Sequence, residues 1–265
     1  MTALRFIQVD AFADRPFAGN PAAVMLLDDW LEDATLQAIA AENNLAETAF
    51  VVAADGDDAD YALRWFTPLA EVDLCGHATL ASGHVLLSDD PTRDMIRFAT
   101  RKAGVLTVRR SGDGYALDLP AWPATSQPLA EALCRQVGER PVDTLWHDRG
   151  YAVLVYADEQ AVRALRPDFA ALAEAGNLLI IATAPGEATD IVTRAFAPAK
   201  GVNEDPVTGS AHAVIASYWA ARLGRDRFTA HQASPRGGNL GCTLAGDRVI
   251  LEGRCRTVIK GLFQL

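Results

Sequence analysis

Two short stretches of the sequence place glycine and a polar side chain directly before an apolar run. Glu204 to Ala213 contains an acid, a proline turn and the pair Gly209 and Ser210, while Cys75 to Ala81 contains Gly76 followed by a histidine. Both patterns are typical of helix N-termini, where unpaired backbone N–H groups and the helix dipole favour an anion. Glycine also lets a ligand approach the backbone closely. We therefore expect both helix starts to hold an anionic group.

The residues around these two stretches repeat. Arg64 to Pro68 resembles Arg194 to Pro198, and each of these segments precedes one of the two glycines. The distance along the chain from the arginine to the glycine is three residues longer in the second copy than in the first. We place these three extra residues at Glu204 to Pro206. A repeat unit of about 130 residues is far longer than a solenoid unit and predicts two domains of one fold.

The repeat predicts domains at residues 1–120 and 128–265, joined by a proline-rich linker from Pro120 to Pro128 that we do not expect to enter either sheet. The sequence of each half predicts many short strands and one long apolar helix, which begins at Gly76 in the first half and at Gly209 in the second. We predict an α+β fold of two pseudo-symmetric domains, each with a curved, mostly antiparallel sheet wrapped around a central helix. The cleft between the halves is then the natural site.

Composition excludes several classes of function. The chain has 265 residues, half of them hydrophobic, and a formal net charge of −10, so nucleic acid and anionic lipid are poor partners. The apolar runs are shorter than a bilayer requires, and the N-terminus has no signal-peptide core. The four cysteines lack a CxxC spacing, which argues against a zinc site and a disulfide framework. We expect a soluble cytoplasmic protein without a metal.

Glu47 is a candidate for acid/base chemistry. It stands after Ala46 at the head of an intensely apolar strand, from Ala49 to Val52. An apolar wall raises a carboxylate pKa towards the range in which the group can take up and return a proton. The plainer interpretation is a charge that faces water where the strand begins.

His77 and Asp205 are candidates because of where the repeat places them. His77 corresponds to Ser210, so a polar donor follows glycine at both helix starts, although a histidine there can simply hydrogen-bond within the structure. Asp205 lies in the predicted three-residue excess, where an asymmetric reacting group could have been added, although Asp before a helix is often only a cap. Cys75 corresponds to Thr208, so a racemase with two thiols is not expected.

Four blocks of sequence resemble the signature blocks of the phenazine-biosynthesis PhzF-like isomerase family. They occur in the family's order over nearly the whole chain. The blocks are Val9 to Phe12 with Gly19 to Val24, Asn44 to Phe50, Cys75 to Leu80, and Glu204 to Ala211. The resemblance implies the diaminopimelate-epimerase fold, an active site between the two halves, and a homodimer.

The resemblance also implies roles for individual residues. Glu47 would move a proton between two carbons, first as the base and then as the acid, and His77 and Asp205 would orient the substrate or relay protons. No cofactor takes part. The substrate would be a small carboxylic acid, which can be cyclic. The residues that would bind it are Asn20, Gly76, Gly209 and Ser210.

Two alternatives remain open at this stage. A family member could bind a metabolite or a protein partner at the same residues without turnover. A dehydratase or racemase of the proline-racemase branch of this fold would instead use Cys75, opposite Thr208.

Overall fold

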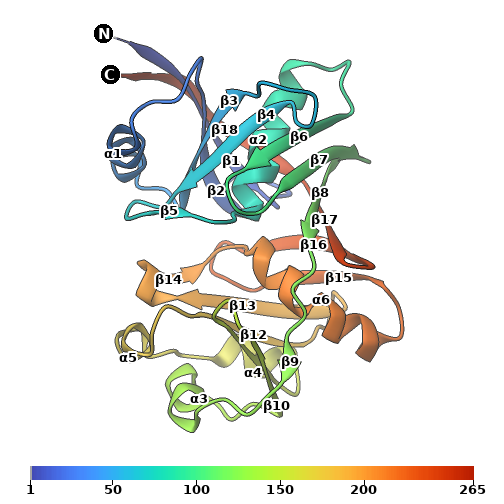
Figure 1. Cartoon of the computed structure of the whole chain (residues 1–265). Helices are drawn as coiled ribbons and strands as arrows, with labels where there is room; N and C mark the ends of the chain where they lie inside the picture. The colour runs from blue at the N-terminus through green and yellow to red at the C-terminus, as the bar shows by residue number, and fades with distance from the viewer. Residues whose placement is uncertain (1) are drawn as a thin grey trace. The chain divides into compact units, whose positions relative to one another are not determined.

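The computed structural model describes residues 2–265, which form two compact units (Figure 1). The first unit consists of the chain up to Leu119 together with Leu251–Leu265, and the second is Pro120–Ile250. Both combine many strands with few helices, so the predicted α+β class is confirmed. Within the described residues, no helix is both long and apolar enough to cross a membrane.

The first unit begins and ends with strands that pair with each other. Its elements are β1 (Ala3–Ala11), β2 (Asn20–Leu26), α1 (Asp33–Asn43), β3 (Glu47–Ala53), β4 (Tyr61–Phe66), β5 (Glu71–Val72), α2 (Gly76–Asp89), β6 (Met95–Thr100), β7 (Val105–Ser111), β8 (Gly114–Pro120) and β18 (Cys255–Gln264). β1 lies antiparallel to both β2 and β18, β2 is parallel to β3, and β4 is parallel to β6. The last strand of the chain therefore belongs to the first unit, which the predicted range 128–265 did not anticipate.

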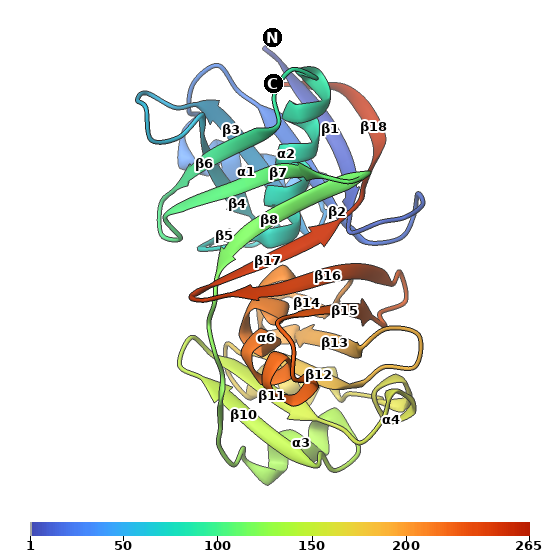
Figure 2. The same cartoon turned by 90° about the vertical axis from the view of Figure 1, so that its right-hand side faces the viewer.

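Helix α2 is the centre of the first unit. It contacts β1, β2, β3, β6 and β7, and 11 of its 14 residues are buried. A helix that is apolar on all sides can be stable only when it is enclosed, and Figure 2 shows strands on more than one side of it. Gly83 makes this enclosure possible, because a Cβ atom there would lie 2.4 Å from Val108 on β7.

The second unit repeats this plan around another helix. Its elements are β9 (Thr125–Ser126), α3 (Glu131–Val137), β10 (Asp143–His147), β11 (Tyr151–Val155), α4 (Glu159–Ala164), α5 (Phe169–Glu174), β12 (Leu179–Pro185), β13 (Ile191–Ala197), the 3₁₀ helix η1 (Pro198–Lys200), β14 (Val202–Asp205), α6 (Gly209–Leu223), β15 (Arg227–Gln232) and β16 (Gly238–Ala245), and β17 (Arg248–Gly253) crosses the boundary. β11 is parallel to β12, and β13 is parallel to β15, as in the first unit.

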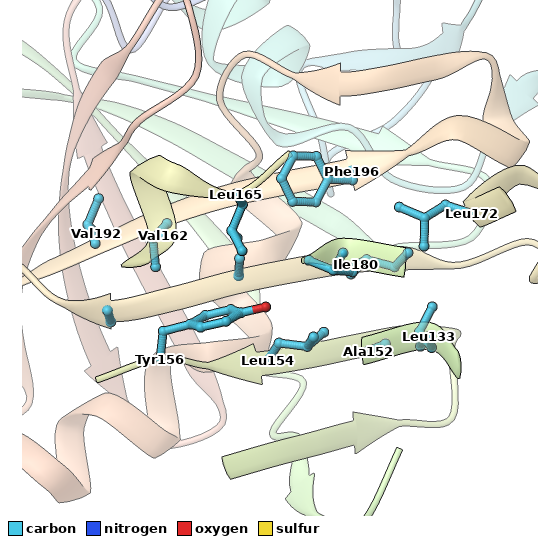
Figure 3. Packing of buried hydrophobic residues seen from close by; sticks show 13 residues of the cluster. Leu133, Ala152, Leu154, Tyr156, Val162, Leu165, Leu172, Ile180, Val192 and Phe196 are labelled. Carbon is cyan, nitrogen blue, oxygen red and sulfur yellow. The ribbon is translucent and has the colours of Figure 1, made fainter. Parts of the chain in front are cut away.

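The core of the second unit lies where α3, α4 and α5 cover β11, β12 and β13. Figure 3 shows its buried side chains, among them Leu154, Tyr156, Ile180 and Phe196. The helix α3 was not predicted from the sequence. The expectation that the linker enters no sheet was wrong for two residues, since Thr125 and Ser126 pair with β10 between the flanking prolines.

Candidate active site

The start of α2 places two polar side chains inside the first unit. Cys75 precedes the helix in an extended conformation, with φ −137°, and makes no side-chain hydrogen bond to it. Gly76 and His77 are the first two helical residues, and both are buried. Thr79 closes the first turn by donating its hydroxyl hydrogen to the carbonyl oxygen of Cys75 at 2.6 Å. The buried imidazole of His77 is thereby fixed by the helix backbone.

Glu47 meets His77 from the neighbouring strand. It is the first residue of β3, which is held in parallel register by β2, with Glu47 opposite Ala22. Its Oε2 atom lies 3.1 Å from Nε2 of His77, and the Glu47 side chain is 17% exposed against 4% for His77. No other group in residues 2–265 provides this buried oxygen with a hydrogen bond. The carboxylate thus has one close partner and a partial opening to solvent.

Asn20 and Cys75 complete the surroundings of the imidazole. The Nδ2 atom of Asn20 lies 3.1 Å from Nδ1 of His77, and the sulfur of Cys75 lies 3.5 Å from the same nitrogen. Asn20 is fully buried, and it follows Gly19, where φ is +65° and a Cβ atom would lie 2.2 Å from the carbonyl oxygen of Ala11. An amide nitrogen facing Nδ1 fits a neutral ring, whereas a flipped amide would accept from an imidazolium. The Asn20 amide can therefore serve either protonation state of His77.

The charge of this cluster follows from its contacts. Burial alone would lower the pKa of His77, but the adjacent Cys75 and Glu47 outweigh burial and raise that pKa well above its usual value. Burial, followed by the charge of Glu47, raises the pKa of Cys75 to about 11. Because the Cys75 thiol is uncharged at neutral pH, the charge that favours a protonated His77 ring there is that of the Glu47 carboxylate.

Glu47, Cys75 and His77 are also close enough together to hold a metal ion. Their candidate ligand atoms all lie within 4.8 Å of one another. In this structure Glu47 and His77 contact each other directly, with 3.1 Å between Oε2 and Nε2, which is a hydrogen-bonding distance.

The start of α6 is held by a different network in the second unit. Thr208 precedes Gly209 in an extended conformation, with φ −112°, and its hydroxyl donates to the Oδ2 atom of Asp205. Gln232 on β15 accepts the Thr208 N–H at 2.8 Å and donates to the carbonyl oxygen of Asp205 at 2.7 Å. Asp205 is therefore tied to the helix start through Thr208, and Ser210 follows as the second helical residue.

Matching side chains show that the two helix starts correspond. His212 donates from Nδ1 to the carbonyl oxygen of Thr208 at 2.8 Å, just as Thr79 donates to the carbonyl oxygen of Cys75 at the corresponding place in the first unit. Burial lowers the pKa of His212 to about 4, so this ring is neutral. It serves as part of the helix start and not as a proton carrier.

Two buried arginines occupy corresponding positions in the two units, and their hydrogen bonds show where the three extra residues of the second copy lie. Arg64 forms two hydrogen bonds with Glu71, seven residues later, and Arg194 forms two with Glu204, ten residues later. Each glutamate then stands five residues before its helix start. The three extra residues therefore lie in the turn after β13 that contains η1. The prediction that Asp205 belongs to these extra residues was wrong. Asp205 corresponds to Val72.

The predicted site residues fall into two groups, one at each helix start. Asn20, Glu47, Gly76 and His77 come together in the first unit, and Asp205, Gly209 and Ser210 come together in the second. The sequence repeat predicts that both groups bind the same ligand, and this stays a prediction.

Sequence reasoning missed Gln232, whose side chain accepts the N–H of Thr208 before the start of α6. Gln232 carried no signal in the sequence, because only the parallel pairing of β13 and β15 brings it near Thr208.

The sequence and the fold resemble those of known proteins over nearly the whole chain. The family model described as phenazine biosynthesis-like protein matches residues 9–261. An uncharacterized isomerase of Pseudomonas aeruginosa is 50% identical over 263 residues, covering 99% of each chain, and a human phenazine biosynthesis-like domain-containing protein is 39% identical, covering 95% of this chain and 96% of its own.

Comparison with solved structures also finds similar folds. The crystal structure of a PhzF-family protein of Enterococcus faecalis covers both chains completely with a TM-score of 0.90 and 40% identity. A predicted epimerase of Pseudomonas aeruginosa has a TM-score of 0.73 at 20% identity, covers 99% of each chain, and shares the fold alone. The architecture is that of the diaminopimelate-epimerase-like α+β proteins. Within that class, this chain belongs to the phenazine biosynthesis-like, or PhzF-like, family.

Proposed function

We propose that the protein is a cofactor-independent isomerase that shifts a proton between two carbons of a small carboxylic acid, which can be cyclic. Its relatives of 50% and 48% identity are named isomerases, which supports this class of enzyme. The observation that carries the proposal is the contact of 3.1 Å between the Glu47 carboxylate and the His77 imidazole at a buried helix start. A carboxylate that keeps partial access to solvent beside a fixed proton donor is suited to general acid/base catalysis.

In this proposal Glu47 removes a proton from one carbon and returns it to another. No oxidation or external group is needed, because one proton leaves the substrate and one proton is returned to it. The proton carried by Glu47 can exchange with solvent, since the side chain is 17% exposed. His77, protonated at neutral pH, stabilises negative charge that develops on the substrate. Asp205 orients the ligand from the other helix start, where Thr208 holds its carboxylate.

The substrate carboxylate would be held by backbone N–H groups at Gly76 and Gly209 and by the hydroxyl of Ser210. The N-cap side chains of both helices, Cys75 and Thr208, make no hydrogen bond to these groups. Orphan N–H groups at helix starts bind anions well. Asn20 would contribute by fixing the orientation of the His77 ring.

A thiol mechanism fits the site less well. The residue that corresponds to Cys75 is Thr208, so the second thiol of a two-thiol racemase is missing. The pKa of Cys75 is about 11, which leaves little thiolate at neutral pH. We therefore assign the proton transfer to Glu47.

The test is solvent-deuterium exchange into a panel of small carboxylic acids, with wild type and two variants. Glu47→Gln keeps the size of the side chain but removes the proton carrier, so the exchange rate should fall at least about 100-fold. Cys75→Ser is the matched control and should exchange nearly as wild type. A dead Cys75 variant with a normal Glu47 variant would establish the thiol route instead. If a metabolite binds but neither variant alters any exchange, the protein is a binding member of the family.

A further inference from the structure

Arg149 is a positively charged side chain of the second unit that the proposed mechanism does not use. It lies in the turn between β10 and β11 and is exposed, and no acidic side chain in residues 2–265 pairs with it. Its guanidinium carbon lies 4.7 Å from the centre of the Trp122 ring. The indole N–H of the half-buried Trp122 donates no hydrogen bond within the same residues. A cation and an N–H donor therefore stand together without an acceptor, an arrangement suited to an anion.

The matching buried arginines align the strands of the two units. Arg64 pairs with Phe50 on β3, and Arg194 pairs with Ala182 on β12. Phe50 is the fourth residue of β3, and Ala182 is the fourth residue of β12. The strands β3 and β12 therefore correspond from their first residues onward.

The neighbouring strands β2 and β11 then correspond as well. Ala22 pairs with the first residue of β3, and Tyr151 pairs with the first residue of β12, in both cases in parallel. Two residues before Ala22 is Asn20, and two residues before Tyr151 is Arg149. Asn20 reaches the imidazole of His77 at the start of α2. The second unit thus has an unpaired arginine where the first unit has a residue of the candidate site.

The turn that carries Arg149 is fixed by its own hydrogen bonds. The N–H of Gly150 donates to the carbonyl oxygen of His147 at 3.0 Å, and the N–H of Arg149 donates to Nδ1 of the same histidine at 3.3 Å. Gly150 has φ +83°, and a Cβ atom there would lie 3.1 Å from the carbonyl oxygen of Asn177. Glycine suits this conformation best, so the backbone of Arg149 is held in one place.

Aromatic rings connect the guanidinium to α6. The ring of Trp122 is stacked with that of His147 at a centroid distance of 6.2 Å, and it lies 6.0 Å from the ring of Tyr151. The backbone N–H of Trp122 donates to the carbonyl oxygen of Ala213 at 3.2 Å, and Figure 2 shows this segment passing α6 between β8 and β9. Ala213 lies three residues after Ser210, so the two share one face of the helix. Trp122 is therefore anchored about one turn along α6 from Ser210.

We infer that Arg149 is a specificity-determining residue that binds a second anionic group of the substrate, which is then a dicarboxylic acid or a similar dianion. The proposed function assigns the first carboxylate to the helix starts and to Ser210. A guanidinium offers parallel N–H groups that match the two oxygens of a carboxylate, and the indole N–H of Trp122 adds a further donor. This inference rests on the proposed function, because that function places the first carboxylate.

The test compares the dissociation constants of benzoate and of the isomeric benzenedicarboxylates, measured by isothermal titration calorimetry. At least one dicarboxylate should bind wild type about 10-fold more tightly than benzoate, as expected for an added hydrogen bond to a charged group. In Arg149→Gln this advantage should fall below about 2-fold, because glutamine stays polar but carries no charge.

Arg140→Gln is the matched control, because Arg140 is an exposed arginine of the same unit that likewise has no acidic partner in residues 2–265. It should keep the wild-type ratio of the two constants, and urea midpoints will show that all variants are folded. The inference is overturned if no dicarboxylate binds wild type more tightly than benzoate, if Arg149→Gln keeps the advantage, or if Arg140→Gln loses it. Failure of the proposed function appears elsewhere, as unaltered deuterium exchange in Glu47→Gln.

Discussion

At the scale of single residues, the chemistry depends on how His77 carries its charge. A buried histidine would ordinarily be neutral, yet its contacts with Cys75 and Glu47 raise its pKa. In the proposed mechanism the protonated ring beside Glu47 would also balance charge that develops on the substrate. The proposed roles of Glu47 and His77 therefore depend on each other.

The raised pKa of His77 has a consequence for stability. Its folded-state pKa lies above the unfolded value of about 6.5, so the stabilisation is complete below that pH. It is lost as the pH rises above 6.5 and through the raised folded-state pKa. We expect the urea midpoint of wild type to fall over this alkaline range, and His77→Gln should flatten the fall. Equal slopes for the two proteins would show that His77 does not titrate as assigned.

At the scale of elements, the two helix starts use different side chains for one bond. Thr79 in α2 and His212 in α6 both donate to the carbonyl oxygen four residues earlier. The threonine has no titratable group, whereas burial disfavours a positive charge on His212. The start of α6 is thus sensitive to acid in a way that the start of α2 is not.

His212→Thr tests this difference by copying the α2 arrangement. Burial lowers the pKa of His212 to about 4, so its contribution is present above pH 6.5 and is lost as the pH falls towards 4. The wild-type loss from this group is about 3 kcal/mol at most. We expect the variant to lose about 1–3 kcal/mol at pH 7 through reduced packing, but to show a flatter acid slope in urea unfolding. His231→Asn serves as the surface control, and a wild-type slope in His212→Thr would contradict the assignment.

At the scale of the whole molecule, the first unit depends on the end of the chain. β18 pairs with β1 along its length, and Phe263 packs on the cluster that includes Leu4 and Leu36. The strands that carry Asn20 and Glu47 follow β1 in the same unit. Loss of β18 should therefore reach the candidate site.

A chain that ends at Gly253 tests this dependence. It lacks β18, so β1 loses its hydrogen bonds on one side, and hydrogen exchange in β1, β2 and β3 should rise sharply. Deuterium exchange into substrate should be lost with it. A chain that ends at Phe263 is the control, because it keeps the packing of Phe263 and removes only Gln264 and Leu265, of which Leu265 is 42% exposed. Native protection of β1 in the shorter chain would show that β18 is dispensable.

The expected homodimer is also a property of the whole molecule. The family resemblance predicts it, and sedimentation equilibrium of the purified protein will measure it directly. We expect a mass of twice 28.4 kDa at micromolar concentration. A single species at 28.4 kDa across the concentration range would establish a monomer.

From the residues alone, the α+β class and the family could be predicted correctly, and the polar residues at the two helix starts could be singled out as candidates. Short motifs such as Gly76 with His77 and Gly209 with Ser210 are local, because a helix start is specified by a few adjacent residues. The apolar surroundings of Glu47 were likewise visible in the residues that follow it. Alternation and helix periodicity allowed most elements to be recognised, but the helix α3 was missed.

Only the tertiary structure decided which distant residues complete each helix start. Asn20 reaches His77 through the pairing of β1 with β2, and Gln232 reaches Thr208 through the parallel pairing of β13 with β15. The ion pairs of Arg64 and Arg194 likewise moved the three extra residues away from Asp205. Strand register and side-chain contacts between segments far apart in the chain arise from packing of the whole unit. Such contacts leave no pattern in a local stretch of sequence.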